Sequence, residues 1–263
     1  MNLVENRVLS SASSYDIVDG LIIEKKVDQS VSISNRPSLT EMLREIGPLP
    51  QEALFFGIAA DGKPVLLNLW DSTPGPLLVL GDPGSGKTDF LKVVANFVVS
   101  THQPCEIQYG VVTTRPHEWE HCEDYPHCIG IFSAVDKSVT SFIRALIAWT
   151  EMNKVGQQSV LLLIDGLDDF IYWHSELGRE FRKILLHGPA KKIWTIVTLN
   201  PESTRNVSTW LECFHTRIFG YTKNTSIIDH DDSYIAGFER LFKGMEFRLK
   251  EGSQWLRFWI PRI

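Results

Sequence analysis

A glycine-rich stretch, Gly81–Thr88, has the residue types that a polyphosphate-binding loop needs. It reads GDPGSGKT, so four residues separate its first glycine from the closing Gly-Lys-Thr. Several donors must converge on a polyphosphate, and only glycine lets backbone N–H groups turn inward without a clash at Cβ. A helix predicted to begin at Lys87 adds the positive end of its dipole. The pattern predicts a loop that binds the phosphates of ATP.

The residues of this loop have separate expected roles. Gly84 and Gly86 provide backbone freedom, Lys87 places an ammonium between the terminal phosphates, and the Thr88 hydroxyl can ligate Mg²⁺. The residues predicted to bind the nucleotide are Gly81, Asp82, Pro83, Gly84, Ser85, Gly86, Lys87, Thr88 and Asp89. A glycine-rich turn without a ligand is the alternative interpretation, and the apolar strand and amphipathic helix on either side argue against it.

A carboxylate is expected opposite the loop, because the magnesium ion of a bound triphosphate takes a ligand from the end of a neighbouring strand. Asp165 directly follows the apolar run Val160–Ile164. We therefore predict that Thr88 and Asp165 form a metal site. An acid after an apolar run is weak evidence alone, and its pairing with the phosphate loop is what favours this assignment.

The elements that position these residues alternate along the chain. Continuous apolar strands are expected at 77–80, 106–112, 129–132, 160–164, 193–199 and 217–221, with helices at 87 onward, 135–153, 176–186 and 206–212. Such alternation is typical of a parallel sheet buried on both faces, in a doubly wound α/β domain. Alternating residues predict one β-hairpin before this core, turning at Asp61–Gly62, and another after it, turning at Gly252.

The first fifty residues differ from the remainder. They are more polar and serine-rich, with a short apolar stretch at Leu21–Ile23. Ser38 with Glu41 predicts a capping box at a helix over 38–46. We therefore predict an N-terminal extension of short strands and a helix over residues 1–50, followed by the main domain over residues 51–263.

Composition excludes several classes of protein. The 26 basic and 32 acidic residues give a charge of −6, so any DNA contact must be local. No apolar run approaches the ~20 residues of a membrane-spanning helix, and the first residues lack an export signal, so a cytoplasmic protein is expected. Four cysteines are too few for a disulfide framework, and the histidines and cysteines within 117–128 lack metal-site spacing. We interpret 117–128 as ordinary loop.

Several segments, taken in order, resemble the FtsK/HerA superfamily of ring-shaped ATPases, which includes the type VII secretion ATPases. Phe55–Thr88 resembles the pattern in which a short hairpin and a linker precede the nucleotide loop. Leu146–Val155 is similar to the helix before the second motif, Thr198–Thr222 to a "TQRP … TRI" segment, and Leu241–Gly252 to the family's ending. The resemblance covers most of residues 52–263 and implies a RecA-like P-loop NTPase fold.

The sequence departs from this family at positions that serve hydrolysis. Gly166 stands where the family has the glutamate that polarises the attacking water, so hydrolysis is expected to be slow. Asp168 or Asp169 could act in its place. The family's glutamine sensor falls on Leu199, and Asn200 is the nearest polar substitute.

One family arginine is present and another is absent. Arg217 matches the arginine of the "TRI" segment, which implies contact with the γ-phosphate or with a neighbouring subunit, while a strand-edge salt bridge is an equal alternative. A trans-acting arginine position falls on Gly188, with Arg182, Lys183, Lys191 and Lys192 nearby. The residues expected to act in catalysis are Lys87, Asp165, Asp168, Asp169, Asn200 and Arg217.

The resemblance implies an ATPase that uses ATP and Mg²⁺ and assembles as a homo-oligomer, in a hexameric ring. Double-stranded DNA is the polymer expected to move through the ring, with protein second. Aromatic and basic residues over 172–183 could contact that polymer, although a solvated helix face explains them at least as well. Two alternatives stay open. LLLIDGLDDF resembles the second motif of NACHT-type nucleotide switches, and Gly166 with Gly188 is compatible with a non-hydrolysing ring scaffold.

Overall fold

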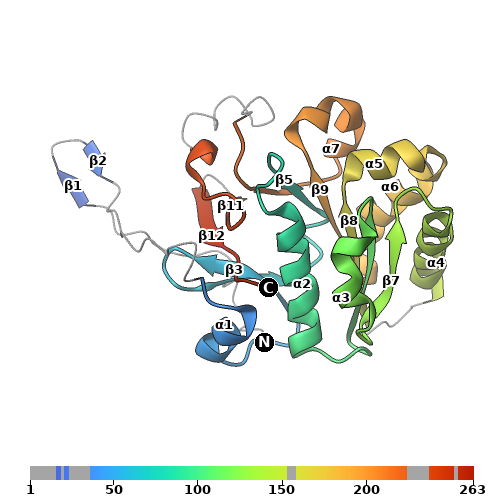
Figure 1. Cartoon of the computed structure of the whole chain (residues 1–263), viewed down its shortest axis with the longest axis horizontal. Coiled ribbons are helices and arrows are strands. Elements are labelled where there is room, and N and C mark those ends of the chain that lie inside the picture. Colours follow the sequence, from blue (N-terminus) through green and yellow to red (C-terminus); the bar gives the residue numbers. More distant parts are fainter. Residues whose placement is uncertain (1–15, 19–20, 24–35, 153–157, 224–236, 252–253) are drawn as a thin grey trace.

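A ten-stranded mixed sheet runs through the molecule (Figure 1). The computed structural model describes residues 16–18, 21–23, 36–152, 158–223, 237–251 and 254–263. The strands of the large sheet are β3 (Ala53–Ala59), β4 (Pro64–Asn68), β5 (Leu77–Leu80), β6 (Ile107–Thr113), β7 (Cys128–Ser133), β8 (Ser159–Asp165), β9 (Ile193–Leu199), β10 (Thr216–Phe219), β11 (Glu246–Glu251) and β12 (Gln254–Trp259). Their order is β4-β3-β12-β11-β10-β5-β9-β8-β6-β7.

The six strands from β10 to β7 are parallel to one another. The apolar residues of β10, β5, β9, β8 and β6 are buried on both faces, because alternate side chains enter different cores, whereas Ile129 of the edge strand β7 is exposed. On β5, Leu77 and Val79 pack into one hydrophobic cluster, and Leu78 and Leu80 into the other. The predicted parallel sheet, buried on both faces, is confirmed.

Two hairpins extend this parallel region. Strands β3 and β4 form the hairpin before the core, and β11 and β12 the hairpin after it. Both were predicted, but their mutual pairing was not: Phe258 and Trp259 of β12 pair with Ala59 and Ile58 of β3. Strand β11 then pairs antiparallel with β10. The hairpins therefore belong to the same sheet as the nucleotide motif.

Helices cover both faces of the sheet (Figure 1). They are α1 (Leu39–Ile46), α2 (Lys87–Thr101), α3 (Glu120–Glu123), α4 (Ser138–Met152), α5 (Leu167–Trp173), α6 (Gly178–His187) and α7 (Ser208–Leu211). Side chains of α1, α2 and α3 pack into the first cluster, and those of α4 to α7 into the second. This two-sided packing confirms the doubly wound α/β fold. No described helix combines the length and the apolar character that crossing a membrane requires.

Helix α1 packs on the main sheet although it lies before the predicted boundary at residue 50. Ser38 and Glu41 form the predicted capping box. Leu39 and Met42 are buried in the first cluster, and the Leu39 N–H donates to the Arg262 carbonyl over 3.0 Å. A separate two-stranded sheet contains β1 (Asp16–Val18) and β2 (Leu21–Ile23). The boundary itself remains a prediction.

Two segments differ from the sequence-based expectation. Helix α5, which follows Asp165 after one residue, is not among the predicted helices. The interpretation of 117–128 as loop is wrong in part, because η2 (Pro116–Trp119) and α3 lie there, with Trp119 and Cys122 fully buried. Each helix is shorter than eight residues, too short for a helical period to be visible in sequence. The predicted helix end at 153 and the turn at Gly252 lie outside the described residues.

Candidate functional site

The glycine-rich loop joins the carboxyl end of β5 to the first turn of α2. Gly84 and Gly86 have φ of 78° and 91°, in the left-handed region that glycine adopts without strain. Within the described residues, no side chain caps the start of α2, so the N–H groups of its first turn face the cleft without a side-chain acceptor. Together with the helix dipole, these groups make the loop suitable for an anion.

Asp82 ties the loop to the segment that follows β10. Its N–H donates to the Tyr221 carbonyl over 2.9 Å. Its carboxylate accepts hydrogen bonds from the Thr222 hydroxyl at 2.8 Å and from the Lys223 N–H at 3.0 Å. The Asp82 side chain therefore faces away from the cleft and supports the loop from behind.

Gly86 is also required by close packing. A Cβ atom at this position would lie 2.8 Å from the Gly244 backbone, in addition to the cost of a left-handed φ. We expect Gly86→Ala to lower the free energy of unfolding by about 2–4 kcal/mol, measured by urea denaturation. The matched control is Gly84→Ala, where φ is also positive but nothing lies within 4 Å. Equal losses in the two variants would show that the contact with Gly244 contributes nothing.

A cleft of about 500 Å³ opens beside the loop. The residues that line it are Pro83, Gly84, Gly86, Lys87, Thr88, Asp89, Thr114, Arg115, Glu118, Asp165, Gly166, Asp168, Asp169, Thr198, Leu199 and Asn200. Most of the predicted site residues are therefore brought together. Three residues of the loop, Gly81, Asp82 and Ser85, are not among the lining residues, and Ser85 is fully buried.

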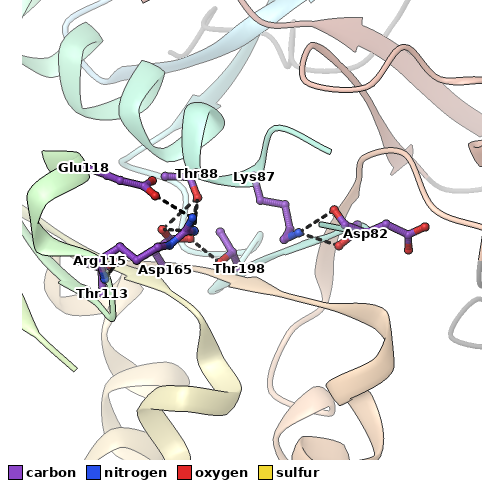
Figure 2. Close-up of polar contacts among 9 residues, drawn as sticks. Asp82, Lys87, Thr88, Thr113, Arg115, Glu118, Asp165 and Thr198 are labelled. Atoms are coloured by element: carbon purple, nitrogen blue, oxygen red, sulfur yellow. Dashed lines mark hydrogen bonds and ion pairs between the residues drawn. The ribbon is translucent and has the colours of Figure 1, made fainter. Parts of the chain in front are cut away.

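Asp165 meets Thr88 across the cleft, as predicted (Figure 2). The Thr88 hydroxyl lies 3.1 Å and 3.0 Å from the two Asp165 carboxylate oxygens. The Thr198 hydroxyl, which the sequence did not single out, donates to Asp165 Oδ1 over 2.9 Å. The Asp165 side chain is only 5% exposed.

The arrangement fits a magnesium ion. A hydroxyl and a carboxylate supply the oxygen ligands that Mg²⁺ prefers. The lining carries five carboxylates, on Asp89, Glu118, Asp165, Asp168 and Asp169, against the cations of Lys87 and Arg115. Because the cleft has an excess of acid, an anionic ligand would need a divalent cation beside it.

Lys87 points back over its own loop (Figure 2). Its ammonium donates to the Gly81 carbonyl at 2.7 Å and to the Asp82 carbonyl at 3.1 Å. Burial lowers the pKa of Lys87 to about 8, against the opposing effect of Asp165 and Asp82. An ammonium has three donors, and only two are directed at these carbonyls.

Arg115 and Glu118 enter the cleft from the segment after β6 and were not predicted. Arg115 Nη1 lies 2.7 Å from Glu118 Oε1. Arg115 Nη2 lies 3.4 Å from the Thr88 hydroxyl and 3.8 Å from Asp165 Oδ2 (Figure 2). One guanidinium therefore connects Glu118 to both residues of the predicted metal site.

Gly166 and the first turn of α5 also line the cleft. Gly166 has φ of 111°, which a glutamate would adopt only with strain. Asp169 turns back over it, since its Oδ2 would lie 3.0 Å from a Cβ on Gly166. Burial, together with the negative charges of Asp168 and Asp165, raises the pKa of Asp169.

The structure does not bring Arg217 to the cleft. Its guanidinium donates to the carbonyls of Phe214 and Leu211, at 3.1 Å and 3.0 Å. Close packing explains the glycine at position 188, because a Cβ atom there would lie 2.3 Å from the Ile184 carbonyl oxygen. Two of the cations near Gly188, Lys191 and Lys192, directly precede β9. They therefore lie at the amino end of this strand, whereas the cleft lies at its carboxyl end.

Several solved structures share this fold, although no family model and no curated protein matches the chain. The cytoplasmic domain of the type VII secretion ATPase EccC from Thermomonospora curvata aligns with a TM-score of 0.68 and 17% identity, over 87% of this chain and 32% of that one. ATPases 2 and 3 of EccC, in complex with a signal sequence peptide, align with a TM-score of 0.63 and 15% identity, over 88% and 43%. The pCW3 conjugation coupling protein TcpA, in monomer form with ATPgS, aligns with a TM-score of 0.59 and 10% identity, over 82% and 68%.

These likenesses show that the chain shares its fold with ATPase domains of EccC and with TcpA. The RecA-like, mainly parallel α/β architecture is confirmed. The chain spans about a third of the EccC cytoplasmic domain and less than half of the EccC fragment that carries ATPases 2 and 3.

Proposed function

We propose that the chain binds ATP with Mg²⁺ at the Gly81–Asp89 loop and hydrolyses it. The contact between Thr88 and Asp165 carries this proposal, because it joins the loop to the carboxylate that such a site requires. Thr88 and Asp165 would hold the ion, which when bound neutralises charge on the phosphates. The nucleotide in the TcpA structure supports the same assignment.

The chain's own groups would bind and orient the triphosphate. The N–H groups at the start of α2 would donate to the phosphate oxygens, and the Lys87 ammonium would supply positive charge. Asn200 lines the cleft just after β9, where its amide could orient a water or a phosphate oxygen. Arg217 is proposed to act at a contact between subunits, since its side chain lies outside the cleft.

We further propose that the chain is the motor subunit of a homo-oligomeric, hexameric ring in the cytoplasm. Double-stranded DNA is the proposed polymer, and a protein substrate is the second choice, which the peptide bound to EccC favours. Tyr172 and Trp173, exposed at the end of α5, are placed to contact a polymer. Their helix begins two residues after Asp165, and we propose that it couples the nucleotide site to the polymer.

Polymer-stimulated turnover tests the motor proposal. Phosphate release should rise at least about threefold when duplex DNA is added to the protein, and electron micrographs should show closed rings. A rise with an unfolded polypeptide but not with DNA would assign the protein substrate instead. No rise with either polymer, together with no ring, would remove the motor proposal while leaving ATP binding intact.

A non-hydrolysing ring scaffold is the second candidate function. The left-handed backbone of Gly166 favours it, because this position does not accept the glutamate that would polarise water. Under this proposal ATP binds and stabilises the assembly without being consumed. Phosphate release from the wild-type protein distinguishes the two candidates, and turnover clearly above the uncatalysed background excludes the scaffold.

A further inference from the structure

We infer that Glu118, positioned by Arg115, is the carboxylate that activates the attacking water. This inference rests on the proposed ATP hydrolysis and assigns a residue that the sequence did not point to. It places the base on the segment after β6, the strand that pairs with β8.

The backbone at Gly166 disfavours a glutamate, although this is the position at which the FtsK/HerA superfamily has its water-polarising glutamate. Its φ of 111° favours glycine, and α5 begins immediately after it. Two acids of that first turn, Asp168 and Asp169, line the cleft. The carboxylate of Asp169 turns back over Gly166, and Asp168 and Asp169 are each one methylene shorter than a glutamate.

Glu118 is positioned by two neighbours. Its carboxylate pairs with Arg115 Nη1 at 2.7 Å, in a short and charge-assisted contact. The next residue, Trp119, is fully buried in the first hydrophobic cluster, so η2 is anchored to the core. The Glu118 side chain is 28% exposed and lines the cleft, which leaves it open to a water molecule.

Arg115 links Glu118 to the metal residues. The same guanidinium reaches the Thr88 hydroxyl at 3.4 Å and Asp165 Oδ2 at 3.8 Å. A guanidinium is planar and presents its donors in a fixed fork, so it sets the separation of the groups it contacts. The Arg115 guanidinium therefore contacts both Glu118 and the two residues of the proposed metal site, Thr88 and Asp165.

In this assignment Glu118 acts as the general base for attack of water on the γ-phosphate. The water oxygen forms a bond to the γ-phosphorus while the bond between that phosphorus and the β–γ bridging oxygen breaks. The electron pair of the broken bond stays with ADP. A Glu118 carboxylate oxygen takes a proton from the water and returns it to solvent, and the products are ADP and inorganic phosphate.

Replacement of Glu118 by glutamine tests the assignment. Glu118→Gln keeps the size of the side chain but removes its basicity, so kcat should fall about 10²-fold. The dissociation constant for ATP with Mg²⁺, measured by calorimetry, should stay within about threefold of wild type, since the phosphate loop is untouched. The matched control is Glu120→Gln, an exposed acid on α3 that does not line the cleft, for which kcat should not change.

A double-mutant cycle tests the positioning role of Arg115. Arg115→Ala should lower kcat in the wild-type background and have little further effect when Glu118 is already glutamine. Independent, multiplicative losses would overturn the positioning role.

The possible outcomes separate this inference from the function on which it rests. If the wild-type protein binds ATP but releases no phosphate, hydrolysis and the base assignment fall together. If it turns over and Glu118→Gln retains more than about a third of kcat, only the base assignment falls. A large loss in Asp168→Asn or Asp169→Asn, with none in Glu118→Gln, would place the base on α5 instead.

Discussion

Replacing Asp165 by asparagine is expected to lower ATP turnover about 10³-fold, and this is one of the two largest effects that the structure predicts. Asp165 is nearly buried and accepts the hydroxyls of both Thr88 and Thr198. The asparagine amide keeps the shape but loses the negative charge that a divalent cation requires. Affinity for ATP should therefore become insensitive to Mg²⁺. Phosphate release and calorimetry with and without the ion measure the two effects.

Thr198→Val is the matched control for this change. It removes one hydroxyl from Asp165 but leaves the carboxylate in place, so turnover should fall by only about tenfold. Melting curves should show that both variants fold. Wild-type turnover in Asp165→Asn would contradict the assignment of this carboxylate.

The second large effect is expected from Lys87→Met. Methionine keeps much of the length and apolar stem of lysine but removes the ammonium that contacts the Gly81 and Asp82 carbonyls. Binding of ATP should weaken at least about 10²-fold and turnover should fall about 10³-fold, because the loop loses its positive charge. Calorimetry and phosphate release measure these losses. Lys92→Met, on the next turn of α2 and outside the cleft lining, is the matched control.

The pH dependence of binding gives a second readout of Lys87. Burial lowers its pKa to about 8, so the free protein loses the ammonium as pH rises through this value. The triphosphate favours the charged form. Affinity for ATP should therefore be constant below about pH 7 and should fall by up to about tenfold per unit above pH 8. Lys87→Met should lack this slope, and a slope of the same size in the variant would assign it to another group.

The conformation of the Gly81–Thr88 loop could be predicted because its determinants are local. Eight consecutive residues determine the turn, and the strand and helix on either side follow from apolar patterns. Asp165 could be predicted for a related reason, since the carboxyl ends of parallel strands meet at one edge of a sheet. Both hairpins were visible as alternating residues.

Arg115, Glu118 and Thr198 could not be predicted in the same way, because they depend on strand order and register. Thr113, at the end of β6, pairs with Asp165 at the end of β8, so the segment after β6 enters the cleft. Thr198 of β9 likewise pairs with Asp165 of β8. The sequence predicts parallel strands but does not specify which strands are neighbours. The signal available in the sequence was weaker. It consisted of charged residues, among them Arg115 and Glu118, soon after the apolar strand predicted at 106–112.

The resemblance to a known family also had a physical limit. It placed Arg217 at the γ-phosphate or at a subunit contact. The guanidinium lies outside the cleft and donates to the Phe214 and Leu211 carbonyls, so only the subunit contact stays a proposal. It also aligned Gly188 with a position at which the family has a trans-acting arginine. The backbone around Gly188 leaves no room for the Cβ atom of any such side chain. Side-chain roles depend on local packing, which a match of motifs does not report.

The most direct test of the central claim is a calorimetric titration of the protein with ATP. In the presence of Mg²⁺ we expect saturable heat with one site per chain, and affinity at least about tenfold lower when a chelator removes the ion. No saturable heat with ATP and Mg²⁺, or the same binding curve for Lys87→Met, would contradict a site in which the α2 N–H groups, Lys87, Thr88 and Asp165 hold the nucleotide together.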